Sequence, residues 1–109
     1  ETDFILTADQ VAAAITEKTK LLIINSPSNP SCRVIPPDEM RRIVEVCAGR
    51  GVYVITDECY LFFAYPPAEP FSLASLPEEL REHVCIAGSF SKTFAITGGR
   101  AGYTIANAD

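Results

Sequence analysis

One lysine, Lys92, lies among serines directly after an apolar run of the chain. Ser89 and Ser91 precede it, and Arg100 follows it. A lysine amine attacks an aldehyde only when it is neutral, which burial or a nearby cation favours. Hydroxyl groups, the backbone amides of a turn and a forked guanidinium together suit a phosphate. The stretch therefore suits pyridoxal phosphate, which carries an aldehyde and a phosphate on one molecule.

Each of these residues also has a purely structural explanation. Taken alone, Lys92 is better explained as an exposed surface lysine, the serines as turn residues and Arg100 as half of a surface ion pair. The apolar neighbours Phe90 and Phe94 weaken the surface explanation for the lysine. The functional interpretation then depends on what else the fold brings to the same place.

Two earlier clusters could supply the rest of such a site. Asp57 closely follows the apolar run 52–55, so we expect it to be largely buried, and a buried carboxylate needs a partner. A protonated pyridine nitrogen is one such partner, although Asp57 could also cap the following turn. The phenol of Tyr60 and the amide of Asn29 could both reach the ring oxygen beside the imine. Their structural alternatives are an aromatic core residue and a turn residue before Pro30.

Helix-type and strand-type patterns alternate along the chain, which indicates an α/β sheet. Apolar runs at 21–24, 52–55 and 84–87 predict strands that are covered on both faces, and 103–106 predicts a fourth strand. Helical crossovers make the first three strands parallel, so their carboxyl ends lie side by side. Ligands bind outside these ends in open α/β sheets, and the three polar clusters follow these strands.

Helix signals precede or separate these strands. Thr7 with Gln10 three positions later predicts a capping box at the start of a helix. Pro37 can open a second helix, because the first turn needs no amide from it. A shorter helical signal spans 77–83. The apolar stripe of the second helix consists of Met40, Ile43, Val44 and Cys47.

Size and composition exclude several classes of protein. A chain of 109 residues with 48% hydrophobic residues can form one modest packed domain. The net charge of −5 argues against a nucleic-acid partner, and no apolar run is long enough to span a membrane. The four cysteines lack CxxC spacing, which indicates free thiols in a reducing compartment, a cytoplasmic location and no metal site.

In their order and spacing, three motifs resemble those of the class I/II aminotransferases, the aspartate-aminotransferase-like branch of the fold-type I pyridoxal-phosphate-dependent enzymes. Segment 25–31 resembles the family's Asn-Pro segment, 57–60 its Asp-x-x-Tyr segment and 89–103 its cofactor-lysine signature. The likeness covers essentially the whole chain. Two positions depart from the family pattern: Cys32 stands where glycine is usual, and Gly99 stands where an aromatic residue is frequent.

The resemblance implies a role for each candidate residue. Lys92 would form the internal Schiff base with pyridoxal 5'-phosphate and later shuttle a proton between Cα and C4′. Asp57 would pair with the pyridine nitrogen. Tyr60 and Asn29 would hydrogen-bond the phenolic oxygen. The phosphate would be bound by Ser89 and Arg100, with Ser91 adding to them.

The resemblance also implies a larger protein around this chain. Residues 1–109 would be the central part of the fold-type I large domain, with four neighbouring strands, three parallel and the last antiparallel, and flanking helices. The phosphate loop, a ring-stacking aromatic residue, the arginine for the substrate carboxylate and a second subunit would all come from outside it. The complete protein would be a cytoplasmic homodimer that moves an amino group between an amino acid and a 2-oxo acid. The isolated chain would be inactive.

Two other functions remain open on the sequence alone. The cofactor residues do not distinguish an aminotransferase from a carbon–sulfur lyase, a decarboxylase or a racemase on the same fold. Some transcription regulators also carry an aminotransferase-like domain as an effector-binding module. A transaminase alone needs a 2-oxo acid as second substrate, and a regulator would carry a basic winged-helix segment upstream.

Overall fold

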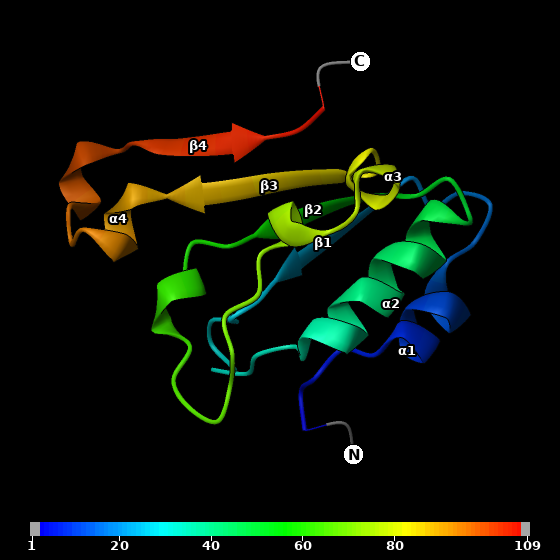
Figure 1. Cartoon of the computed structure of the whole chain (residues 1–109), viewed down its shortest axis with the longest axis horizontal. Coiled ribbons are helices and arrows are strands. Elements are labelled where there is room, and N and C mark those ends of the chain that lie inside the picture. The colour runs from blue at the N-terminus through cyan, green and yellow to red at the C-terminus, as the bar shows by residue number, and fades with distance from the viewer. Residues whose placement is uncertain (1–2, 108–109) are drawn as a thin grey trace.

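The computed structural model describes residues 3–107, which form one mixed sheet with helices packed against it (Figure 1). The strands are β1 (Leu21–Asn25), β2 (Tyr53–Asp57), β3 (Val84–Ser89) and β4 (Gly102–Ile105). The α-helices are α1 (Ala8–Ala14), α2 (Pro37–Ala48), α3 (Glu78–Arg81) and α4 (Phe90–Thr93). Short 3₁₀ turns are η1 (Leu61–Phe63), η2 (Leu73–Ser75) and η3 (Thr97–Gly99).

The sheet has the strand order β1-β2-β3-β4. β1 pairs with β2 and β2 with β3 in parallel, and β4 returns antiparallel to β3 along the edge of the sheet (Figure 1). Each parallel connection contains a helix, as a crossover between parallel strands requires. The predicted α/β class, with three parallel strands and a final antiparallel one, is confirmed.

The two longer helices begin where the sequence signals predicted. The Thr7 hydroxyl accepts from the Gln10 backbone N–H at 3.3 Å, and the Gln10 side chain accepts from the Thr7 N–H at 3.0 Å. This reciprocal capping box satisfies two amides that the first helical turn leaves free. Pro37 is the first residue of α2, where its missing amide costs nothing.

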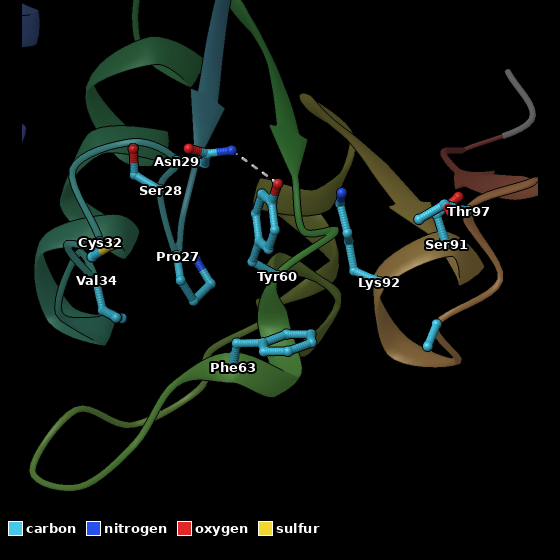
Figure 2. Close-up of a pocket in the computed structure, with 11 residues that line it drawn as sticks. Pro27, Ser28, Asn29, Cys32, Val34, Tyr60, Phe63, Ser91, Lys92 and Thr97 are labelled. Carbon is cyan, nitrogen blue, oxygen red and sulfur yellow. Dashed lines mark hydrogen bonds between the residues drawn. The ribbon is translucent and has the colours of Figure 1, made fainter.

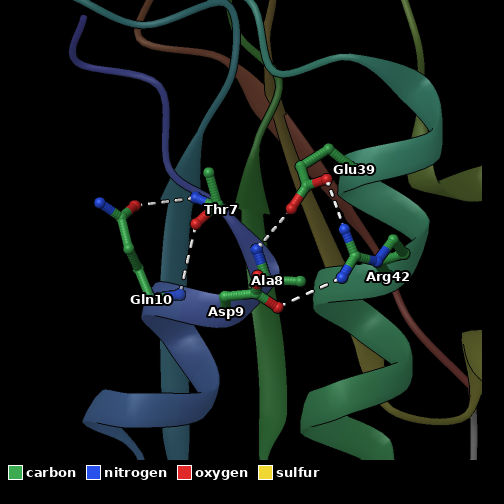
Figure 3. Close-up of polar contacts among 6 residues, drawn as sticks. All are labelled: Thr7, Ala8, Asp9, Gln10, Glu39 and Arg42. Carbon is green, nitrogen blue, oxygen red and sulfur yellow. Dashed lines mark hydrogen bonds and ion pairs between the residues drawn. The ribbon is translucent and has the colours of Figure 1, made fainter. Parts of the chain in front are cut away.

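Polar contacts join α1 to α2 at their amino-terminal ends (Figure 3). A Glu39 carboxylate oxygen accepts from the backbone N–H of Ala8 at 2.6 Å. Arg42 bonds to Glu39 at 3.1 Å and to Asp9 on α1 at 3.2 Å. The Glu39 carboxylate therefore binds a free amide of α1 and also binds Arg42, whose guanidinium contacts α1 through Asp9. These contacts hold the two helices together.

One face of the sheet carries the hydrophobic core. Ile24, Val54 and Ile86 lie on this face and are at most 3% exposed. Against them pack the stripe of α2, the first turns of α1 and the buried leucines of η2 and the segment after it. The four residues predicted as the stripe of α2, Met40, Ile43, Val44 and Cys47, are all buried.

The opposite face of the sheet is open, which corrects the expectation that both faces of the strands are covered. Ile23 is 67% exposed, Tyr53 58% and Leu21 45%. These side chains alternate with the buried ones, and the helices that form the core all lie on the other face. Within residues 3–107 no helix is both long and apolar enough to cross a membrane.

A close contact between β3 and β4 requires glycine at one position. The ring of Tyr103 lies so near Gly88 that a Cβ atom there would overlap it. Tyr103 is also the strand partner of Gly88, and its ring packs on that of Phe90 with centroids 5.5 Å apart. The contact fixes β4 against the end of β3, where the chain turns toward Lys92.

Candidate active site

The carboxyl ends of the first three strands meet at one edge of the sheet. Asn25 pairs in register with Asp57, and Asp57 pairs with Ala87. The loop after β1, the turn after β2 and the short helix after β3 therefore begin next to one another. The structure brings together the three polar clusters that the sequence placed after these strands.

Asn29 and Tyr60 come from the first two of these segments and contact each other (Figure 2). The Asn29 side-chain amide donates to the Tyr60 hydroxyl oxygen at 3.1 Å. Because that oxygen accepts from Asn29, the Tyr60 hydroxyl hydrogen is free to donate to a ligand. The pair therefore offers a phenolic donor at the mouth of the site.

Asp57 is half-buried, which corrects the expectation that it is largely buried. It alternates with the buried Thr56 and so faces the open side of the sheet. One of its carboxylate oxygens accepts from the backbone N–H of Cys59 at 3.0 Å. Asp57 therefore caps the following turn, which was the structural explanation for this residue. It also lines a cavity.

Cys59 lies beside this carboxylate and lines the same cavity. Burial, followed by the hydrogen bond to Asp57 and its negative charge, raises the pKa of the Cys59 thiol to about 11. The group is therefore a neutral thiol at neutral pH and can donate its hydrogen to Asp57.

Lys92 lies on α4 and is exposed, although apolar residues flank it in the sequence. Its amine is 5.8 Å from the centre of the Tyr60 ring, within the range of a cation–π contact. Figure 2 shows the amine next to the Tyr60 ring. The rings of Phe90 and Phe94 pack on each other instead of covering the lysine, with centroids 5.9 Å apart.

Ser89 and Ser91 lie at the start of α4, and Arg100 directly follows η3. Ser89 is the N-cap of α4, and its hydroxyl accepts from the Ser91 backbone N–H at 3.1 Å. Ser89 therefore stabilises the turn at the start of α4, which was the structural explanation for this serine. Ser91 is 7% exposed. Arg100 has a left-handed backbone, with φ 49°, and donates to the Thr97 carbonyl at 3.1 Å.

Two cavities, each of about 430 Å³, meet at Lys92. Three residues line both cavities: Ser91, Lys92 and Thr97. Asn29 and Tyr60 line the first, and Asp57, Ser89 and Arg100 line the second. The second cavity therefore has a carboxylate, an amine, a guanidinium and two serine hydroxyls around one space. All seven residues that the sequence singled out line one cavity or the other.

The structure adds three residues that the sequence reasoning missed: Asn25, Cys59 and Thr97. Asn25 directly follows the apolar run 21–24, much as Asp57 closely follows the run 52–55. Cys59 lies inside the Asp-x-x-Tyr segment, and Thr97 lies between Lys92 and Arg100. Their positions in known motifs could have identified them, but their contacts depend on the tertiary structure.

The two departures from the family pattern differ in their structural setting. Cys32 has φ 56°, in the left-handed region that favours glycine, and its N–H donates to the Ser28 carbonyl at 2.9 Å. The turn therefore keeps a conformation that suits glycine although a side chain is present. A Cβ on Gly99 would lie 3.7 Å from the Ile96 side chain, an ordinary contact distance. Space is thus available beside Arg100 for a side chain.

Comparison with known proteins identifies the family. The family model described as "Aminotransferase class I and II" matches residues 1–109. The aspartate aminotransferase of Bacillus sp. (strain YM-2) is 38% identical over 109 residues, all of this chain and 28% of that protein.

Solved structures agree with this sequence similarity. The aromatic aminotransferase of Pyrococcus horikoshii OT3 superimposes with a TM-score of 0.91 and 38% identity, over 97% of this chain and 28% of that one. A PLP-bound structure from Clostridium difficile has a TM-score of 0.85 and 25% identity, over 94% and 26% of the two chains. The chain thus spans about a quarter of the length of the relatives it matches. It belongs to the class I and II aminotransferase family.

Proposed function

We propose that the complete protein containing this chain is a pyridoxal-phosphate-dependent aminotransferase that moves an amino group between an amino acid and a 2-oxo acid. The observation that carries this proposal is the second cavity, where Asp57, Lys92 and Arg100 surround about 430 Å³. A carboxylate, an amine and a guanidinium match the three polar groups of the cofactor. These are a ring nitrogen, an aldehyde and a phosphate. Family membership supports the same activity.

The residues around this cavity fit the cofactor. Asp57 would pair with the ring nitrogen and keep it protonated. Lys92 would supply the amine that attaches to the aldehyde. Ser89, Ser91 and Arg100 would bind the phosphate. When bound, the cofactor supplies an electron sink for the carbon that loses its proton.

Tyr60 and Asn29 act on the oxygen beside the reacting carbon. The hydrogen of the Tyr60 hydroxyl is free because its oxygen accepts from Asn29 at 3.1 Å. Tyr60 would therefore donate to the phenolic oxygen of the cofactor. A donated hydrogen bond favours the anionic form of an oxygen. The amine of Lys92 would be the group that accepts and returns the proton in the transfer between Cα and C4′.

We further propose that residues 1–109 are the central part of the large domain and that the complete protein is a cytoplasmic homodimer. The share of its relatives that the chain spans, about a quarter, supports the first statement. Its four cysteines are all free, which is compatible with a reducing compartment. Neither nucleic acid nor a membrane belongs to this proposal. The partners are the two small-molecule substrates.

Borohydride reduction tests the assignment of Lys92. We expect reduction of the complete protein with its cofactor to attach the cofactor irreversibly to the peptide that contains Lys92, as measured by peptide mass spectrometry. The Lys92→Ala variant should show no label and lose at least about a thousandfold in kcat. The peptide containing the exposed Lys20 is the internal control and should stay unlabelled.

Attachment at another lysine, or none in the wild-type protein, would refute the proposal. Conversion of the amino acid at equal rates with and without a 2-oxo acid would exclude transamination and support one of the other reactions of the fold.

A further inference from the structure

Asn25, the last residue of β1, uses both ends of its side-chain amide. Its Nδ2 donates to the Asp57 backbone carbonyl at 3.0 Å. Its Oδ1 accepts from the Asn29 backbone N–H at 2.9 Å. One half-buried side chain therefore joins the loop after β1 to the end of β2, and each of these segments carries a residue of the candidate site.

The two contacts of Asn25 act where regular pairing ends. Asn25 and Asp57 form the last pair of the β1–β2 register, and the chain beyond each follows its own turn. Asn29 is exposed, so packing does little to hold it. A second anchor fixes the far end of the same loop, where the Ser26 hydroxyl accepts from the Ile35 N–H at 3.0 Å. The backbone N–H of Asn29 is itself bonded to Asn25.

These contacts close a circuit around the site. Asp57 leads along the chain to Tyr60, Tyr60 accepts from Asn29 at 3.1 Å, and Asn29 is held by Asn25, which returns to Asp57. We propose that Asn25 is a positioning residue that sets where the Asn29–Tyr60 pair lies relative to Asp57. The inference rests on the proposed function, because Asp57 and Tyr60 would both contact the bound cofactor.

The chemistry of the two contacts favours an amide at position 25. One partner is a carbonyl oxygen and needs a donor, and the other is an N–H group and needs an acceptor. An aspartate would set a carboxylate oxygen against the Asp57 carbonyl. Leucine has a similar size and forms neither bond, so Asn25→Leu removes the connection without adding charge.

The test compares Asn25→Leu with the wild type in the complete protein. In the variant, the absorbance of the bound cofactor should change with pH at a midpoint about one pH unit higher than in the wild type. This shift follows because a displaced Tyr60 stabilises the anionic ring oxygen less. Without cofactor, hydrogen exchange at the Asn29 amide should become about tenfold faster, because its acceptor is gone.

Ser26→Ala is the matched control, since it removes one hydrogen bond from the same loop and touches neither Asn29 nor Asp57. It should lower thermal stability as Asn25→Leu does but leave the absorbance midpoint at the wild-type pH. If Asn25→Leu does not fold, Asn25→Ser replaces it, because serine is neutral and too short to span both partners.

The possible outcomes separate the two proposals. A wild-type protein whose Lys92 is not labelled by borohydride refutes the proposed function. If Lys92 is labelled in the wild type but the absorbance midpoint is unchanged in the Asn25 variant, the role of Asn25 is refuted and the proposed function is not. An equal shift in Ser26→Ala also refutes it, because a general loosening of the loop would then account for the change.

Discussion

Tyr60 has a single hydroxyl group, and its neighbours decide what that group offers to a ligand. Asn29 occupies the oxygen at 3.1 Å, which leaves the hydrogen as a donor. The sequence could identify both residues, because each lies in a polar cluster after an apolar run. It could not predict their bond, because two turns of different geometry bring these residues together from positions 31 apart.

The Cys59 thiol gives a prediction at the scale of one residue. Burial and the Asp57 carboxylate raise its pKa to about 11, so only a small fraction is thiolate near pH 8. We expect iodoacetamide at about pH 8 to alkylate the exposed Cys32 at least tenfold faster than Cys59, as followed by peptide mass spectrometry.

Replacing the carboxylate provides the control for this prediction. Asp57→Asn removes the negative charge, so Cys59 should react faster in this variant than in the wild type. Equal rates for Cys32 and Cys59 in the wild-type protein would contradict the prediction.

Between elements, Glu58 links three segments behind the site. Its N–H donates to the Ala87 carbonyl at 2.8 Å, and its own carbonyl accepts from the Leu61 N–H at 2.9 Å. Its buried carboxylate accepts from the Leu73 N–H at 2.9 Å, which joins η2 to the end of β2. Burial raises the pKa of this carboxyl, against the opposing effect of hydrogen bonds from Ser72 and Leu73.

The stability contribution of Glu58 should therefore depend on pH. Its raised pKa means that the contribution is complete below the ordinary glutamate pKa of 4.5 and is lost as pH rises through the folded-state pKa. Glu58→Gln keeps an acceptor for Leu73 and removes the charge. Relative to wild type, we expect this variant to gain free energy of unfolding, by about 1 kcal/mol, between about pH 4 and pH 8.

Urea unfolding at both pH values measures this difference, and the exposed Glu45→Gln is the control that should show none. A constant difference between Glu58→Gln and wild type across the range would contradict the assigned cause.

The sequence predicted the strands but ended three of them too early. The apolar runs stop at 24, 55 and 87, whereas β1 continues to Asn25, β2 to Asp57 and β3 to Ser89. Backbone pairing extends beyond the apolar side chains, since Asp57 pairs with Ala87 and Ser89 with Gly102. Hydrophobic patterning records burial, whereas the ends of a strand depend on the neighbouring strand.

For the whole molecule, the uneven covering of the sheet was not predictable from apolar runs. Such runs indicate that strands are flanked by apolar groups on both faces, but they do not say which segment supplies the cover. Here the helices cover one face, and Leu21, Ile23 and Tyr53 remain exposed on the other. An open apolar face together with a length of about a quarter of its relatives supports the proposal of a larger domain.

The isolated chain gives the prediction at this scale. The cations that line the two cavities are Lys92 and Arg100. Under the proposed function the cofactor would engage both, which leaves no cation in these linings for the substrate carboxylate. We expect the purified 109-residue chain to produce no detectable 2-oxo acid from an amino acid, whereas the complete protein does. Turnover by the isolated chain, measured in a coupled assay, would contradict this expectation.

The antiparallel strand β4 has a consequence for the entropy of ligand binding. Residues 90–101 form a closed loop whose two ends, Ser89 and Gly102, are paired neighbours in the sheet. Tyr103 on Gly88 holds that closure. A short loop with fixed ends has few conformations to lose, and Lys92 lies within it. Little conformational entropy of the loop is therefore lost when a ligand binds. A larger part of the ligand's contact energy then remains as affinity.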